Sequence, residues 1–159
     1  MTHRFVNMHL NNGKIGLVIV MLNNNIKYCR EELEMTQQEL GYVFGVTGST
    51  VAGWENNHDT MPLSKLVKFS NMYKFSLDYI TGLSTQNIYK EVKIDKKKIG
   101  SNLKAIRNKL NLSQQQLADE CMISQTTYSN YETGLFLVTS LTLYTICLNH
   151  NLSLYDFIN

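Results

Sequence analysis

The chain contains two copies of one sequence pattern. Shifting the sequence by 77 residues aligns Ile26–Gly82 with Leu103–Asn159 without a gap, and 11 of the 57 aligned positions are identical. A repeat of this kind indicates one folding unit used twice, so it constrains the fold more than any single motif. The identical pairs are Lys27/Lys104, Arg30/Arg107, Leu33/Leu110, Gln37/Gln114, Gln38/Gln115, Leu40/Leu117, Thr50/Thr127, Glu55/Glu132, Leu66/Leu143, Ser76/Ser153 and Leu77/Leu154.

Each copy predicts five short helices. Apolar residues recur three and four apart, which places them along one face of a helix. The second and third helices are separated by a very short link, and in the first copy Gly45 is suited to end the second helix. The predicted caps are Thr36 (with Glu39, a capping box), Thr47 and Ser76 in the first copy, where Pro62 precedes the fourth helix, and Ser113, Ser124 and Ser153 in the second. This is an all-α, helix-turn-helix layout.

Composition limits the alternatives. The 159 residues are 43% apolar and 18% charged, with a net charge of +2 that by itself favours no polyanionic partner. Three widely spaced cysteines argue against a disulfide scaffold. The longest apolar run, Ile15–Leu22, has eight residues, whereas a bilayer span needs about 20. A signal peptide is conceivable because Arg4 precedes this run, but Asn23–Asn25 match a cleavage site poorly. We therefore expect a cytoplasmic protein without a membrane partner.

Both copies resemble one known class of domain. The first has Arg30-x5-Thr36-Gln37-x2-Leu40 followed by Val46-Thr47-x2-Thr50-x3-Trp54-Glu55, and the second has Arg107-x5-Ser113-Gln114-Gln115-x-Leu117-Ala118 followed by Ile123-Ser124-Gln125-x-Thr127-x3-Tyr131-Glu132. The pattern is similar to the Cro and phage-repressor type of helix-turn-helix domain, the XRE family. The resemblance implies two tandem lambda-repressor-like domains joined by a short basic linker. The expected divisions are an extension (1–21), a first domain (22–82), a linker (83–95) and a second domain (96–159).

The resemblance also implies a DNA interface. In such domains the third helix enters the major groove, and the helix before it crosses the phosphate backbone. Gln125 stands where the family often has a glutamine that pairs with adenine, whereas the first copy has Gly48 there. The residues expected to contact double-stranded DNA are Gln37, Gln38, Ser49, Thr50 and Asn56 in the first copy, Gln114, Gln115, Ser124, Gln125, Thr126 and Ser129 in the second, and Lys96, Lys97 and Lys98 at the linker.

Other roles have simpler interpretations. The resemblance assigns Arg30 with Glu55, and Arg107 with Glu132, to buried structural ion pairs rather than to DNA. Trp54 and Tyr131 are expected in the core. The Lys96–Lys98 run is either a phosphate-tracking segment or a solvated linker. No metal cluster, cofactor loop or paired catalytic carboxylates is evident, so neither an enzyme nor a bound metal or cofactor is expected.

The leading hypothesis is a sequence-specific transcriptional regulator, a repressor that acts by occupying an operator. The 13-residue connector from Leu83 to Asp95 could stretch about 43 Å and would tether two separate units. The alternative is a protein-interaction module, such as an antitoxin or a phage-encoded inhibitor, whose first copy no longer reads DNA and instead mediates dimerisation or partner binding. A homodimer is compatible with both.

Residues 1–20 have no counterpart in the repeat. Met21-Leu22-Asn23 would make a natural chain start for the family, which would make residues 1–20 an extension of the true chain. Alternatively, Leu17–Leu22 form a short strand or helix that helps two protomers to pair. The sequence leaves both interpretations open.

Overall fold

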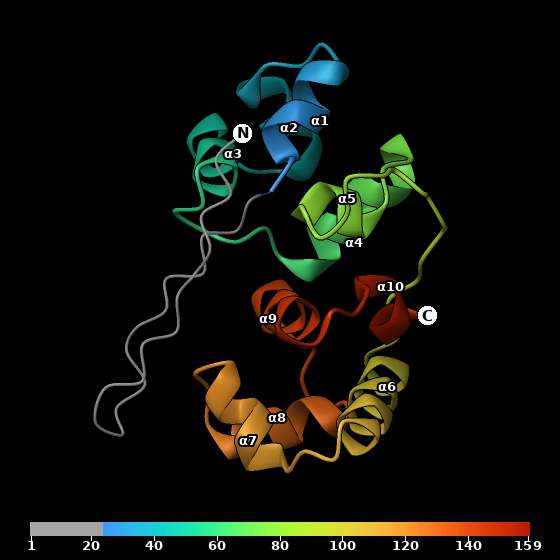
Figure 1. Cartoon of the computed structure of the whole chain (residues 1–159). Helices are drawn as coiled ribbons and strands as arrows, with labels where there is room; N and C mark the ends of the chain where they lie inside the picture. Colours follow the sequence, from blue (N-terminus) through green and yellow to red (C-terminus); the bar gives the residue numbers. More distant parts are fainter. Residues whose placement is uncertain (1–23) are drawn as a thin grey trace, which may run out of the picture.

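The computed structural model describes residues 24–159, and these residues form ten α-helices and no β-strand. Five helices belong to each copy, which confirms the all-α fold with two tandem units (Figure 1). The first copy contains α1 (Ile26–Glu32), α2 (Gln37–Phe44), α3 (Gly48–Glu55), α4 (Leu63–Tyr73) and α5 (Leu77–Thr81). The second contains α6 (Lys96–Lys109), α7 (Gln114–Glu120), α8 (Gln125–Glu132), α9 (Ser140–His150) and α10 (Leu154–Ile158).

The predicted extension over residues 1–21 lies outside the described residues, as do both interpretations of its apolar run and the chain start at Met21. Between residues 24 and 159, no helix combines the length and the apolar character that crossing a membrane requires. The predicted domain boundaries stay predictions.

The helix starts follow local side-chain chemistry. The Thr36 hydroxyl accepts the backbone N–H of Glu39, and the Glu39 carboxylate accepts the backbone N–H of Thr36 at 2.7 Å, so the predicted capping box is confirmed. Accepting this N–H stabilises the charged carboxylate and lowers the pKa of Glu39. Ser113 and Gln116 form the same arrangement at the start of α7. Local sequence therefore fixes where the second helix of each copy begins.

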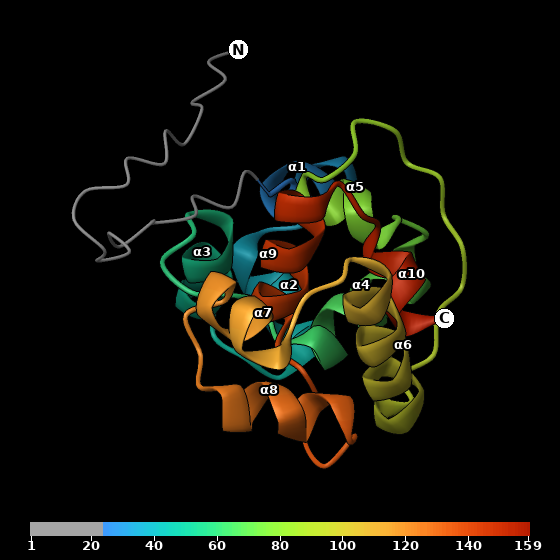
Figure 2. The ribbon, with the colours of Figure 1, turned by 60° about the horizontal axis from the view of Figure 1, so that its bottom comes forward.

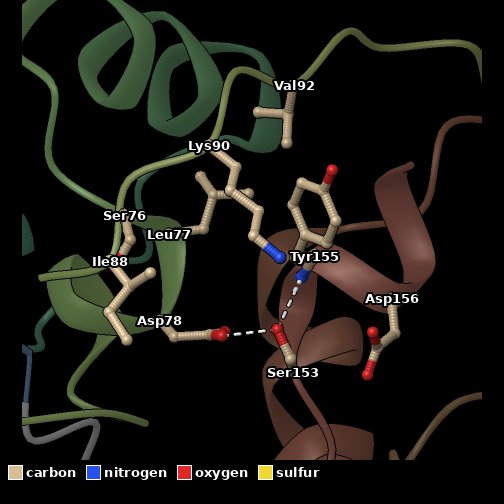
Figure 3. A pocket seen from close by; sticks show the side chains of 9 residues that line it. All are labelled: Ser76, Leu77, Asp78, Ile88, Lys90, Val92, Ser153, Tyr155 and Asp156. Carbon is tan, nitrogen blue, oxygen red and sulfur yellow. Dashed lines mark hydrogen bonds between the residues drawn. The ribbon is translucent and has the colours of Figure 1, made fainter. Parts of the chain in front are cut away.

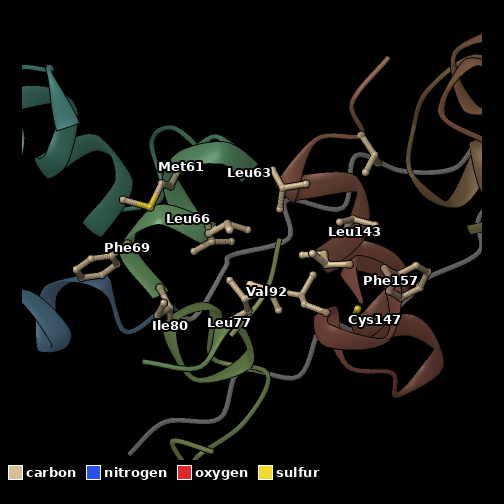
Figure 4. Close-up of a cluster of buried hydrophobic side chains, with 14 of the residues drawn as sticks. Met61, Leu63, Leu66, Phe69, Leu77, Ile80, Val92, Leu143, Cys147 and Phe157 are labelled. Atoms are coloured by element: carbon tan, nitrogen blue, oxygen red, sulfur yellow. The ribbon is translucent and has the colours of Figure 1, made fainter. Parts of the chain in front are cut away.

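One hydrophobic core runs through both copies. Figure 4 shows Leu66 of α4 and Leu77 of α5 on one side, and Leu143 of α9 and Phe157 of α10 on the other, with Val92 of the connector between them. All five side chains are at most 4% exposed. Burying apolar surface between the copies stabilises their contact, because each Å² of apolar surface removed from water contributes roughly 25 cal/mol. The two units are thus joined by packing as well as by the chain.

Polar contacts fix how the two copies meet. At the start of α10, the Asp78 carboxylate of α5 accepts the Ser153 hydroxyl and the backbone N–H of Leu154, the latter at 2.8 Å. The Ser140 hydroxyl at the start of α9 donates to the carbonyl of Met61. A carboxylate is favourable at a helix N-terminus, where backbone N–H groups lack partners within the helix. These directional bonds specify one relative placement of the copies.

The connector is not a free tether, contrary to the expectation from its length. Val92 is 3% exposed, and the Asn71 side chain of α4 binds both the N–H and the carbonyl of Val92, at 3.2 and 2.7 Å. In Figures 1 and 2 the connector runs along one side of the molecule from α5 to α6. The apolar character of Val92 draws this segment onto the core, so the two units are held together instead of being spaced by an extended chain.

Candidate nucleic-acid interface

Helices α2 and α3 form the helix-turn-helix of the first copy. Gly45 follows α2 with φ 64°, a left-handed conformation that glycine adopts without steric cost. Its N–H and that of Val46 satisfy carbonyls at the end of α2, and Thr47 then caps α3 by accepting the N–H of Thr50. Three residues thus connect α2 to α3, and Ser49 in the first turn of α3 is exposed.

The second copy makes the same turn with different residues. Helix α7 is followed by Cys121 and by Met122, whose φ is 54°, so a bulky side chain occupies the position of Gly45. Ser124 caps α8 by accepting the N–H of Thr127. In both Figure 1 and Figure 2, α8 lies at the outer edge of the molecule. Its first turn, with Gln125 and Thr126, is exposed.

A buried ion pair links the first helix of each copy to the third. Arg30 Nε donates to Glu55 at 2.5 Å, and Arg107 Nε donates to Glu132 at the same distance. Both carboxylates are at most 3% exposed. Each guanidinium also donates to a backbone carbonyl, of Met35 or Leu112. The bond to its carboxylate raises the pKa of each arginine, so both guanidinium groups stay charged at every relevant pH.

Gln37 and Gln114 extend these ion pairs towards the surface. Gln37 Nε2 donates to Glu55 at 2.9 Å, and Gln114 Nε2 donates to Glu132 at 2.7 Å. Both glutamines are also expected DNA contacts, and that role stays a prediction. The structure adds a positioning role that sequence reasoning missed, although the joint identity of arginine, glutamine and glutamate in both copies was a signal for it.

In the second copy this network reaches one residue further. Gln125 Nε2 donates to Gln114 Oε1 at 2.8 Å, so Arg107, Glu132, Gln114 and Gln125 form a continuous chain of hydrogen bonds. A glutamine amide has two N–H donors and one carbonyl acceptor. With one donor engaged by Gln114, Gln125 retains one donor and one acceptor on an exposed helix tip. This is the combination that matches the adenine edge in the major groove.

The first copy has no equivalent of that side chain. Gly48 occupies the place of Gln125, and a Cβ there would lie 3.3 Å from the Gln38 backbone, because α3 approaches α2 closely. The hydroxyls of Ser49 and Thr50 contact the Thr47 hydroxyl at 2.8 and 3.1 Å. The first turn of α3 therefore has short hydroxyl side chains, of which Ser49 is exposed, and no amide.

The other predicted contact residues are distributed around these helix tips. Gln38 and Gln115 are exposed in the first turns of α2 and α7, where Gln115 also binds Asp119. Asn56 donates to the carbonyl of Ala52 at the end of α3. The others are Ser124, which caps α8, Thr126, which is exposed, and Ser129, which is half-buried.

The lysine run belongs to a helix rather than to a solvated linker. Lys96, Lys97 and Lys98 form the first turn of α6, whose cap, Asp95, accepts the N–H groups of Lys97 and Lys98. These bonds lower the pKa of Asp95. Lys96 Nζ donates to the carbonyl of Leu135, just beyond α8. The run is thus next to the C-terminal end of the exposed helix, away from Gln125.

Two asparagines were missed by the sequence analysis. Asn25 and Asn102 stand 77 residues apart, and each side chain donates to a carbonyl of the fifth helix of its copy, at Tyr79 and Phe157. They fix the first helix against the last and touch neither helix tip. Extending the repeat by one residue would have found them.

No group of three or more histidine, cysteine, aspartate or glutamate side chains is placed to hold a metal ion within residues 24–159. Trp54 and Tyr131 are buried, at 2% and 8% exposure, which confirms their expected core role.

Fold and site define a tandem helix-turn-helix protein. A family model described as helix-turn-helix matches residues 26–80 and again residues 103–157. The chain belongs to this family, the XRE or Cro/CI-like type of helix-turn-helix protein.

Two curated proteins of Bacillus subtilis (strain 168) are similar to parts of the chain. One, named uncharacterized HTH-type transcriptional regulator YobD, is 31% identical over 64 residues, which cover 40% of this chain and 57% of that protein. The other, named uncharacterized HTH-type transcriptional regulator YqaE, is 28% identical over 72 residues, which cover 45% of this chain and 62% of that protein. The chain thus spans less than two thirds of either relative.

Proposed function

We propose that the protein is a sequence-specific DNA-binding transcriptional regulator that inserts its third helices into the major groove. The observation that supports this most strongly is Gln125, held by Gln114 on an exposed helix tip with one donor and one acceptor left for a base edge. Two helix-turn-helix family matches and the names of the two relatives agree with this proposal.

The phosphate backbone would meet the start of α7 and the lysines of α6. A helix N-terminus offers unpaired N–H groups and the positive end of the helix dipole to an anion. Lys96, Lys97 and Lys98 are exposed and add positive charge beside the loop after α8. Because each phosphate contact releases counterions, affinity falls as salt rises, independently of sequence.

The regulatory output that this architecture supports best is repression by occupancy. With the tips of α3 and α8 on the DNA, the protein would act by excluding other proteins from its site. We infer a cytoplasmic location, where an operator is accessible. Homodimer formation stays a prediction, which sedimentation velocity would test.

The alternative, a protein-interaction module, has two observations in its favour. The first turn of α3 has Gly48 where a reading side chain is expected, and Glu31, Glu32 and Glu34 are exposed on the first copy. Under this alternative the chain binds no duplex tightly and instead binds another protein.

The proposal is tested by base preference and salt dependence. A duplex is first selected from a random pool with the full chain, and binding is then compared with that of an unrelated duplex. We expect Gln125→Ala to weaken the selected duplex by about 10-fold or more and to leave the unrelated duplex almost unchanged. Replacing Lys96, Lys97 and Lys98 by glutamine should weaken both duplexes alike and flatten the salt dependence.

Equal loss on both duplexes from Gln125→Ala would contradict the assignment of that residue. Failure to enrich any duplex would contradict the proposed function and favour the interaction module. Asn108→Ala, at an exposed position of α6, serves as the matched control and should change neither affinity.

A further inference from the structure

The two copies meet through equivalent parts of the repeat. Asp78 of α5 binds Ser153 and Leu154 at the start of α10. Tyr155, the counterpart of Asp78, lines a hollow of about 240 Å³ together with Ser76 and Leu77, the counterparts of Ser153 and Leu154 (Figure 3). The fifth helices of the two copies, α5 and α10, are therefore packed against each other.

This pairing presents the two helix tips as a fixed set. Helices α4, α5, α9 and α10 lie in the middle of the molecule, with α3 towards one end and α8 towards the other (Figure 1). The shared core and the bound connector hold the copies in one arrangement. A duplex that contacts both tips must therefore contact them at the spacing and orientation that this arrangement fixes.

The two tips offer different chemistry to the bases. The tip of α8 has the Gln125 amide, aligned by three further side chains of the second copy. The tip of α3 has Gly48 at that position, and Gln37 Oε1 faces no amide equivalent to Gln125. At this helix position, the amide that can pair bidentately with adenine is therefore present in the second copy and absent from the first.

From these two observations together we propose that the DNA target is asymmetric. It consists of two half-sites, of which the one facing α8 requires an adenine opposite Gln125, while the one facing α3 is degenerate at the equivalent base pair. The chain then binds its operator in one orientation, unlike a homodimer on a palindrome. This inference rests on the proposed function.

The test is selection from a random duplex pool with the full chain, followed by hydroxyl-radical footprinting on the selected sequence. The footprint should cover two groove segments, and the selected sequences should be strongly conserved in one segment and weakly in the other. A palindromic consensus, equally conserved in both halves, would overturn the inference. Protection of a single segment would also overturn it, because the first copy would then not contact DNA.

Exchanging the residues at positions 48 and 125 provides a more specific test. Gln125→Gly should reduce the preference for adenine in the conserved half by about 10-fold. Gly48→Gln should add an equivalent preference to the other half, and the double variant Gly48→Gln/Gln125→Gly should reverse the orientation of the selected sequence. Selection by Gly48→Gln of the same one-sided sequence as the wild type would count against the inference.

Folding and function are controlled separately. Each variant is compared with the wild type by circular dichroism and thermal unfolding. If Gly48→Gln does not fold, Gln125→Gly alone decides the case, since loss of the conserved half is still expected. Absence of enrichment with the wild type contradicts the proposed function, whereas enrichment of a symmetric sequence contradicts only the asymmetry.

Discussion

The two copies have the same order of helices but different side chains in their hydrophobic cores. The first has several aromatic pairs in its core, among them Phe44 with Trp54 and Phe69 with Phe75. The buried core of the second combines aliphatic side chains, such as Leu117 and Ile146, with the aromatic side chains of Tyr128 and Phe157. Residues that place the elements are the same in both, above all the ion pair and the glutamine bound to it. The comparison shows that a repeat can exchange most of its packing while it keeps the contacts that set geometry.

The copies differ most at their exposed third helices. Helix α3 contains two glycines and short hydroxyl side chains, while α8 contains Gln125, Thr126 and Ser129. The turn before each helix differs as well, with Gly45 in the first copy and Met122 in the second. The residues that hold the helices in place are therefore shared by the two copies, whereas the residues of the third helices that would contact bases differ. Four measurements test this comparison.

The largest effect is expected from the ion pairs. Glu55→Ala and Glu132→Ala each leave a largely buried guanidinium without its carboxylate, which should lower the free energy of unfolding by about 3 kcal/mol or more. Urea denaturation measures this loss. Similar losses would show that both copies depend equally on the pair. A loss below about 1 kcal/mol in either variant would show that the two copies do not depend equally on the ion pair. Glu91→Ala, at an exposed position of the connector, is the control.

The contact between the copies comes next. Asp78→Ala removes the acceptor for two bonds at the start of α10 and should cost about 1–2 kcal/mol. Asp78→Asn keeps one oxygen acceptor and should cost less. Urea unfolding followed by the single tryptophan, Trp54, reports on the first copy, while circular dichroism reports on both. Unchanged stability in Asp78→Ala would argue that this carboxylate does not hold the copies together.

Substitutions in the turns before α3 and α8 should have smaller effects, of opposite sign in the two copies. Gly45 and Met122 both have positive φ, a conformation that costs a residue with a side chain about 1 kcal/mol. Gly45→Ala should therefore destabilise the protein by about 1 kcal/mol, since no neighbouring atom lies near the added Cβ. Met122→Gly should stabilise it by a similar amount, because Met122 is 54% exposed and loses little packing. Opposite signs in thermal unfolding support this; equal signs contradict it.

The smallest effect is expected within α3. Gly53 lies inside the helix, and a Cβ there would contact the Asp59 side chain at an ordinary 3.8 Å. Gly53→Ala should stabilise the protein by about 0.5 kcal/mol through helix propensity. The reverse change next to it, Ala52→Gly, should destabilise by a comparable amount. A lower melting temperature for Gly53→Ala would show that α3 needs this glycine for a reason other than flexibility.

Much of the fold could be read from the sequence because its signals are local. Residues within a few positions of one another determine the capping box at Thr36 and the end of α2 at Gly45. The same local signals predict the five helices of each copy. The repeat added a long-range constraint by aligning Arg30 with Arg107 and Glu55 with Glu132. The position of Gln125 could also be predicted from the sequence, because the cap at Ser124 places it at the start of α8.

The relative placement of the two copies was decided by tertiary structure alone. Asp78 meets Ser153, and Val92 enters the core beside Asn71, through contacts between residues that are not equivalent in the repeat. Such contacts leave neither a periodic nor a repeated signal, and the connector's length permitted an extended tether just as well. The bond from Gln125 to Gln114 is of the same kind, because it depends on how closely α7 and α8 approach. The sequence determined the two repeated units and their helices. Burial of apolar surface between the units determined how they are placed relative to each other.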